Sequence, residues 1–222
     1  DMVSRGLGDV YKRQQHGLND YQIALSMLQA ISTSDKTALV RVPWNEPGII
    51  MKLLDAGALG VICPMINTRA DAEAFVGACR YTPEGYRSAG PTRAMLVHGA
   101  DYIAKANDAV VTLAMIETKE ALDNVAEIVA TPGLTGIYVG PSDLSLSLGY
   151  GPGMDHTRPE MVDAIMAIRD ACKAAGVKVG IHCGTTAYAR DMIAEGFDLT
   201  TISSDLRAYA AAMGQITTDM RA

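Results

Sequence analysis

Two carboxylate residues stand out because each follows an apolar run of strand length. Glu117 ends the run at 110–116, and Asp143 follows the run at 136–140, with an amphipathic segment between them. This pattern predicts a β-strand, a crossover helix and a parallel strand. Parallel α/β sheets carry their chemistry at the carboxyl ends of strands, so both carboxylates are expected to face one crevice. Hard oxygen ligands of this kind suit Mg²⁺ or Mn²⁺, with water and substrate completing the coordination.

Each carboxylate also has a structural interpretation. Glu117 is placed where an acid stabilises the first turn of a helix, and Asp143 is placed where a cap is common. The two residues together, beside the segment GPSDL, favour the metal interpretation.

Composition excludes several classes of protein. The chain has 222 residues, 49% of them apolar and 20% charged, which is typical of one globular domain. The net charge is −6 without a Lys/Arg cluster, so neither nucleic acid nor an anionic membrane is an expected partner. No apolar run approaches the roughly 20 residues of a spanning helix, and no secretory leader is apparent. The four cysteines lack CxxC spacing, and we expect a reduced, cytoplasmic protein with buried thiols.

Alternation of strand and helix patterns runs through most of the chain. The expected strands are 37–42, 59–64, 110–116, 136–140, 177–182 and 197–203. The expected helices are 20–31, 47–57, 69–80, 101–106, 159–175, 185–195 and 205 to the end, and the segments 81–98 and 145–158 are expected loops. This order predicts an α/β fold with a parallel sheet, and its parent architecture is the (β/α)₈ TIM barrel.

The N-terminal segment departs from this alternation. Residues 1–15 show no clean period, and we predict an irregular segment there, followed by a barrel domain at 16–222. Six strands are fewer than the eight of a barrel, so we expect the first one or two strands to be lacking.

The polar residues at strand ends suit enolate chemistry. No lysine ends a strand and no GxGxxG or GxxxxGK[ST] motif is present, so the chemistry is expected to be metal-assisted and free of nucleotide cofactors. Arg41 could stabilise an enolate oxygen, and the backbone around Pro141, Ser142 and Asp143 could hold a substrate carboxylate. His16 is the candidate base, because its unperturbed pKa lies near neutrality. Alternatively, His16 is a surface residue and Arg41 is an ion-pair partner at the barrel mouth, while His182 is interpreted as pocket lining.

Several motifs together resemble the HpcH/HpaI aldolases, which are class II, pyruvate-dependent enzymes of the phosphoenolpyruvate/pyruvate type of TIM barrel. The resemblance extends from about His16 to the C-terminus. It rests on QHG with NDYQ, RVPWNEP, CPMINTRADAE, YTPEGYRS, MIETKEALDN and GIYVGPSDLSLSLGY. Residues 1–15 resemble no part of the family, and Met115 stands where some relatives have glutamine.

The resemblance implies an activity and roles for individual residues. The implied reaction is reversible aldol cleavage of a 4-hydroxy-2-oxo acid, of the 2,4-dihydroxyhept-2-ene-1,7-dioate or 2-keto-3-deoxy sugar acid type, to pyruvate and an aldehyde. The implied cofactor is Mg²⁺, Mn²⁺ or Co²⁺, and the implied assembly is a homo-oligomer, commonly a hexamer with a swapped C-terminal helix. The implied metal ligands are Glu117 and Asp143; the catalytic residues are His16, Arg41 and Asp55, with Asp55 partnering His16; the pyruvate carboxylate lies against Gly140, Pro141, Ser142 and Asp143.

Two alternatives stay open at this point. One is a lyase acting on CoA esters of the malyl or citramalyl type, which would need a nucleotide-binding surface. The other is an inactive, truncated barrel that acts only in assembly, for which the irregular segment at 1–15 is the supporting observation.

Overall fold

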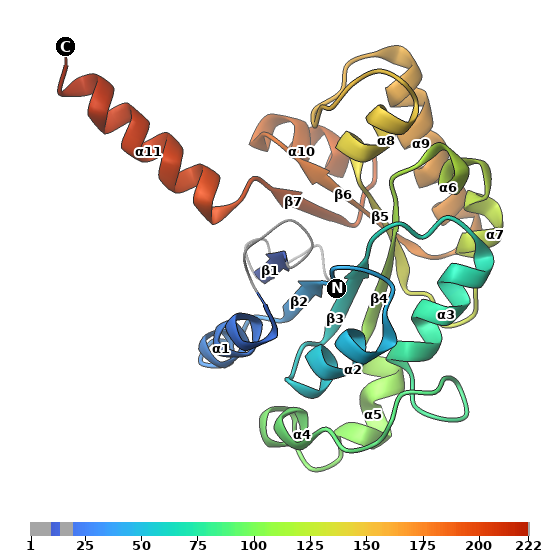
Figure 1. The fold of residues 1–222 in the computed structure, drawn as a ribbon. Helices are drawn as coiled ribbons and strands as arrows, with labels where there is room; N and C mark the ends of the chain where they lie inside the picture. The colour runs from blue at the N-terminus through green and yellow to red at the C-terminus, as the bar shows by residue number, and fades with distance from the viewer. Residues whose placement is uncertain (1–9, 14–19, 222) are drawn as a thin grey trace.

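The fold is a parallel β-sheet that curls, with helices on its outer side (Figure 1). A computed structural model describes residues 10–13 and 20–221 of the chain. Within these residues, seven strands are hydrogen-bonded in chain order, and every neighbouring pair is parallel. The strands are β1 (Val10–Arg13), β2 (Ala38–Arg41), β3 (Gly60–Cys63), β4 (Val111–Ile116), β5 (Gly136–Val139), β6 (Lys178–Cys183) and β7 (Leu199–Ile202). The α/β class predicted from the sequence is confirmed, and the arrangement agrees with part of a TIM barrel.

Alternating residues of the strands line two different cores. Side chains on one face pack inside the curl, and this inner cluster contains Leu39, Ile62, Leu113, Met115 and Tyr138. Their neighbours, such as Val40, Val61 and Ile116, belong to the larger core under the helices. Because the side-chain period of a strand is two, residues two positions beyond an inner residue point to the inner face again. Arg41 follows Leu39, and Glu117 follows Met115, in this way.

Helices connect the strands and cover the outer face of the sheet, except for the last helix, which follows β7. They are α1 (Tyr21–Ile31), α2 (Pro47–Asp55), α3 (Arg69–Cys79), α4 (Thr92–His98), α5 (Tyr102–Ala109), α6 (Lys119–Asp123), α7 (Val125–Val129), α8 (Pro141–Ser147), α9 (Pro159–Ala175), α10 (Thr186–Ala194) and α11 (Asp205–Asp219). Their ends follow from local sequence. Asp20 accepts a hydrogen bond from the Ile23 N–H at 2.9 Å, and α9 ends at Gly176 with φ of 72°.

Three segments differ from the expectations. Strand β1 lies within the range that we expected to be irregular, and its residues VYKR show no alternation that would have indicated it. The expected loops 81–98 and 145–158 are wrong in part, because α4 occupies the end of the first and α8 runs into the second. Pro141 at the start of α8 and the buried Leu144 stabilise that short helix. The division of domains at residue 15 stays a prediction.

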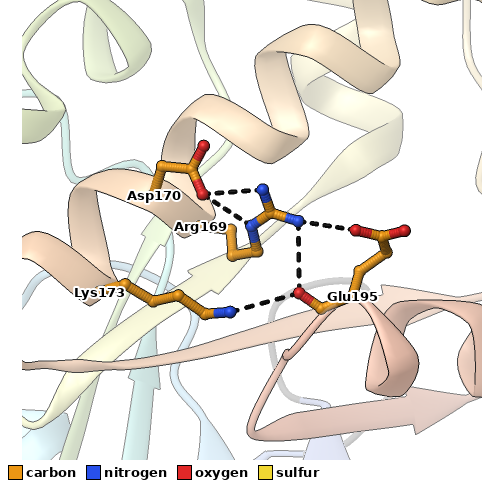
Figure 2. A network of polar contacts seen from close by, with 4 residues as sticks. All are labelled: Arg169, Asp170, Lys173 and Glu195. Carbon is orange, nitrogen blue, oxygen red and sulfur yellow. Dashed lines mark hydrogen bonds and ion pairs between the residues drawn. The ribbon is translucent and has the colours of Figure 1, made fainter.

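Charged residues join α9 to the C-terminal end of α10 on the outer side of the sheet. Figure 2 shows Arg169 of α9 between Asp170 and Glu195, with Lys173 directed at the same end of α10. The Arg169 Nη1 donates to the Glu195 carboxylate at 2.8 Å, and the Lys173 ammonium donates to the Glu195 carbonyl oxygen at 3.4 Å. Basic side chains at the C-terminal end of α10 are favourable for the helix dipole, and they hold α10 against α9.

Helix α11 has no buried residue and extends away from the rest of the chain (Figure 1). Large apolar side chains follow one another along it at helical spacing. They are Leu206, Tyr209, Met213, Ile216 and Met220, with exposed fractions from 43% to 83%. We name this set the α11 stripe. In the part of the chain that the structure describes, no helix is both long and apolar enough to cross a membrane.

The start of α3 provides a stability prediction. Thr68 and Asp71 form a capping box, in which the Thr68 hydroxyl accepts from the Asp71 N–H at 3.1 Å and the Asp71 carboxylate accepts from the Thr68 N–H at 2.9 Å. Thr68→Ala removes one partner of the helix start, and we expect it to lower the free energy of unfolding by about 1 kcal/mol in urea titrations. Asp163→Ala, on the exposed side of α9, is the control and should change the free energy of unfolding by less than about 0.5 kcal/mol. Equal effects of both substitutions would contradict the assignment.

Candidate active site

Arg41 and Glu117 meet at the carboxyl ends of the strands, inside the curl of the sheet. Arg41 is the last residue of β2, and Glu117 directly follows β4. Each is 1% exposed, and the Arg41 Nη2 lies 3.5 Å from the Glu117 Oε2. Both positions follow from the two-residue period of the strands. The sequence analysis expected both residues at the carboxyl ends of strands, and the structure brings them together there.

A backbone N–H orients the Glu117 carboxylate. The Met65 N–H donates to the Glu117 Oε1 at 2.8 Å from the turn after β3. Met65 has φ of 54°, in the left-handed region of backbone conformation that residues other than glycine rarely adopt. Such a conformation costs about 1–3 kcal/mol and is typical of functional sites. The backbone strain at Met65 is therefore coupled to the position of the carboxylate.

The surroundings of Glu117 favour its protonated form. Burial raises the pKa of Glu117 to about 7, while the Arg41 guanidinium and the Met65 N–H act against that rise. The Asp143 carboxylate adds to the rise, through its charge and through side-chain hydrogen bonding. The two predicted metal ligands are therefore close enough to interact directly.

The turn after β5 approaches Glu117 closely because it starts with glycine. The Gly140 N–H donates to the Ile116 carbonyl oxygen at 3.0 Å, and Asp143 lies in the first turn of α8. A Cβ added at Gly140 would lie 2.8 Å from the Glu117 Cβ and 2.8 Å from its Oε2, and would also overlap the Met115 side chain. Glycine at this position is what allows the turn and both carboxylates to share one end of the sheet.

A pocket opens beside these groups. It is lined by Arg41, Met115, Gly140, Pro141, Ser142, Asp143, Met154 and His182. The pocket therefore contains every residue that was predicted to bind substrate. His182 is interpreted as before, as lining: it is 5% exposed, and its Nδ1 lies 2.7 Å from the Thr201 Oγ1. Sequence reasoning missed Met154, because a methionine in the expected loop 145–158 carries no signal of its own.

Two predicted catalytic residues are not placed in this group. His16 lies outside the described residues. Asp55 ends α2, five residues before β3 begins, and therefore lies at the amino ends of the strands, opposite Glu117. Its carboxylate accepts from the buried Arg87 Nη2 at 2.7 Å. Within one chain Asp55 is not brought to Arg41 and Glu117, and its partnership with His16 stays a prediction.

The site has the properties expected of a divalent cation site. Its two carboxylates repel each other, one of them is almost fully buried, and Arg41 is the neighbouring cation. Among the described residues, no cluster of three or more His, Cys, Asp or Glu side chains could hold a metal ion. Two carboxylates with open positions suit a hard cation such as Mg²⁺, which keeps water and substrate oxygens in its coordination. The Arg41 Nε is buried without a hydrogen-bond partner among the described residues, as expected of a group that binds an anionic ligand.

Comparisons with known proteins agree with a lyase of α/β fold. The sequence matches the profile of the HpcH/HpaI aldolase/citrate lyase family over residues 12–212. A hydroxypyruvate/pyruvate aldolase of Rhizorhabdus wittichii is 47% identical over 208 residues, covering 94% of this chain and 83% of the relative. A 5-keto-4-deoxy-D-glucarate aldolase of Shigella dysenteriae is 37% identical, covering 89% of this chain and 77% of the relative. A crystal structure of an HpcH/HpaI aldolase/citrate lyase family protein from Burkholderia cenocepacia superposes with a TM-score of 0.89 at 32% identity, covering 100% of this chain and 88% of that one.

The chain belongs to the HpcH/HpaI aldolase/citrate lyase family. The resemblance drawn from the motifs is thereby confirmed, and so is the prediction of a lyase: the protein is an aldolase of this family.

The close approach at Gly140 provides a prediction about metal binding. In Gly140→Ala the new methyl group would displace the Glu117 carboxylate, and we expect the affinity for Mg²⁺, measured by calorimetry, to fall at least about tenfold. Gly90→Ala is the matched control, because a Cβ there meets nothing within 4 Å. Unchanged affinity in Gly140→Ala would exclude Glu117 as a ligand.

Proposed function

We propose that this aldolase catalyses the reversible, metal-dependent cleavage of a 4-hydroxy-2-oxo acid to pyruvate and an aldehyde. The observation that carries the proposal is the buried pair of Arg41 and Glu117 next to the turn that bears Asp143, with a pocket that Arg41 and Asp143 both line. The names of the two aldolase relatives support the reaction class.

Glu117 and Asp143 would hold the divalent cation, which is Mg²⁺, Mn²⁺ or Co²⁺ by family resemblance. When bound, the cation would supply Lewis-acid polarisation of the 2-oxo group. The protein fixes the Glu117 carboxylate for this task through the Met65 N–H and excludes water from it by burial. These contacts leave Glu117 little freedom to rotate away.

Arg41 and the turn at 140–143 would bind the oxo acid. Both line the same pocket, so a carboxylate lying against the turn would place the 2-oxo oxygen towards Arg41. Negative charge develops on that oxygen as the bond between C3 and C4 breaks. The fixed Arg41 cation would stabilise this charge without reorganising, which is an efficient form of electrostatic catalysis.

Proton transfer completes the reaction. In cleavage, a base takes the proton of the C4 hydroxyl, the C3–C4 electron pair moves towards the 2-oxo group, and C3 is then protonated to give the methyl group of pyruvate. We assign the base to His16 because of its near-neutral unperturbed pKa and its position in the family motif.

Removal of either carboxylate tests the proposal. Glu117→Gln and Asp143→Asn should each abolish pyruvate release from a 4-hydroxy-2-oxo acid and weaken Mg²⁺ binding in calorimetry. Glu120→Gln is the matched control, an exposed acid three positions further along the chain. Full activity in both site variants would reject the proposal, and cleavage of an acyl-CoA substrate in place of the oxo acid would favour the CoA-ester alternative.

Arg41 provides a second test. Arg41→Lys keeps a positive charge but loses the planar guanidinium, and we expect kcat to fall about a hundredfold. A matched change at Arg69, which is exposed and pairs with Glu73 on α3, should leave kcat within about twofold. A wild-type rate in Arg41→Lys would show that the planar group is not required.

The assembly is proposed to be a homo-oligomer of barrels, in which α11 packs against a second copy. The α11 stripe is apolar and exposed, and α1 carries a surface groove lined by Gln22, Ile23, Ser26, Met27 and Ala30. A helix with an apolar face in an apolar groove is a common mode of association. The swapped C-terminal helix and the hexamer implied by family resemblance agree with this arrangement.

Charges on the α11 stripe should disrupt assembly. We expect Tyr209→Glu with Ile216→Glu to sediment as a smaller species than the wild type in analytical ultracentrifugation. Ala211→Glu with Thr218→Glu, on the opposite side of the same helix, is the control and should keep the wild-type mass. Identical masses for both pairs would exclude the α11 stripe as an interface.

A further inference from the structure

Most of the pocket lining has a role in binding the oxo acid, whereas Met154 and His182, whose ring contacts Thr201, do not. Arg41 and the turn at 140–143 face the oxo acid in the proposed function, and Met115 packs against Gly140 and belongs to the inner core. Met154 alone comes from the segment between α8 and α9, which contributes no other lining residue. An enzyme that cleaves one molecule into two must bind both products. The side of the pocket formed by Met154 is therefore a candidate for binding the second product, the aldehyde.

The residues around Met154 are fastened to the turn after β6. The Asp155 Oδ1 accepts from the Gly184 N–H at 2.7 Å, and its Oδ2 accepts from the Thr185 hydroxyl at 2.6 Å. Both oxygens of one carboxylate are therefore used to hold a loop to the start of α10. Hydrogen bonds to a charged acceptor are stronger than neutral ones, so this contact fixes one end of the segment.

The next residue fastens the same segment to the turn that bears Asp143. The His156 Nε2 lies 3.2 Å from the Pro141 carbonyl oxygen and 3.0 Å from the Gly153 carbonyl oxygen. A Cβ at Gly153 would lie 2.7 Å from the His156 Cε1, so the ring occupies space that a side chain at residue 153 would need. We name residues 153–156 the strap: it joins the turn after β5 to the turn after β6, and Met154 directly precedes the two residues that make these attachments.

We propose that the strap forms the aldehyde subsite of this enzyme, with Met154 as a specificity-determining residue and with Asp155 and His156 as positioning residues. This inference rests on the proposed aldol reaction and deepens it. Asp155 and His156 touch no reacting atom; they hold the Met154 side chain at a fixed distance from the oxo acid. Because a thioether side chain is apolar, the wall it forms contacts carbon and offers no charge to a substrate.

The class of aldehyde follows from this lining. Arg41 is the sole arginine or lysine among the described residues that line the pocket, and it is committed to the oxo acid. An aldehyde with its own carboxylate would lack a second fixed cation, and a long chain would meet Met154. The subsite therefore fits a short, uncharged aldehyde, in contrast to the carboxylate-bearing aldehyde that a substrate of the 2,4-dihydroxyhept-2-ene-1,7-dioate type would release.

Chain-length preference tests the role of Met154. With pyruvate as donor, we compare kcat/KM for propanal and pentanal in the wild type, Met154→Ala and Met154→Leu. Met154→Ala should move the ratio in favour of pentanal by about tenfold or more, because a pocket methylene changes discrimination by that order. Met154→Leu, which keeps the volume, should retain the wild-type ratio. An unchanged ratio in Met154→Ala overturns the assignment.

The positioning role of Asp155 needs a readout that does not depend on catalysis. Hydrogen exchange followed by mass spectrometry should show faster exchange in peptides covering 149–158 and 180–188 for Asp155→Ala, since the Gly184 N–H loses its acceptor. Asp155→Asn keeps one acceptor oxygen and should restore much of the protection, and its KM for the aldehyde should lie between those of the wild type and Asp155→Ala. Asp163→Ala, on the exposed side of α9, is the control. Equal hydrogen exchange in Asp155→Ala and the wild type overturns the positioning role of Asp155 in the strap.

Failure of the proposed function is recognised separately. Wild-type enzyme with Mg²⁺ should exchange the methyl protons of pyruvate for deuterium in D₂O, without any aldehyde. Absence of this exchange rejects the aldol reaction, and with it the subsite. Exchange in the wild type together with an unchanged aldehyde ratio in Met154→Ala rejects the subsite alone.

Discussion

The burial of one acidic side chain is the constraint on which the active site depends. Glu117 is placed where β4 points into the curl of the sheet, so its carboxylate is removed from water. A buried carboxylate is costly unless a charge or a hydrogen bond compensates it. Arg41 and the Met65 N–H provide part of that compensation, and Asp143 works against it. The arrangement is consequently one that a divalent cation would complete, because a cation removes the repulsion between the two carboxylates.

Backbone features supply the rest of the arrangement. Met65 adopts a left-handed conformation and Gly140 lacks a Cβ, and both bring peptide groups close to the same carboxylate. The strained backbone at Met65 and the missing Cβ at Gly140 therefore both allow a turn to lie close to the Glu117 carboxylate. The helices behind these turns are anchored in ordinary ways, by capping at Thr68 and by the packing of Leu144.

The sequence predicted the parts of the site that depend on periodicity. Parallel strands with a two-residue period require Arg41 and Glu117 to point inward at one end, and the motif after β5 adds Asp143. Features that depend on loop conformation could not be predicted, since neither the N–H of Met65 nor the placement of Met154 has a composition signal. Asp55 illustrates a different limit: its role came from resemblance, and the structure pairs it with Arg87 at the opposite end of the sheet.

In the proposed assembly, helix α11 would couple folding to protein concentration. None of its residues is buried within its own chain, so its conformation gains no packing free energy there. An isolated helix of about 15 residues is marginal in water. Contact with another copy would therefore stabilise the helix and the association together, and the melting temperature of the protein would rise as its concentration increases.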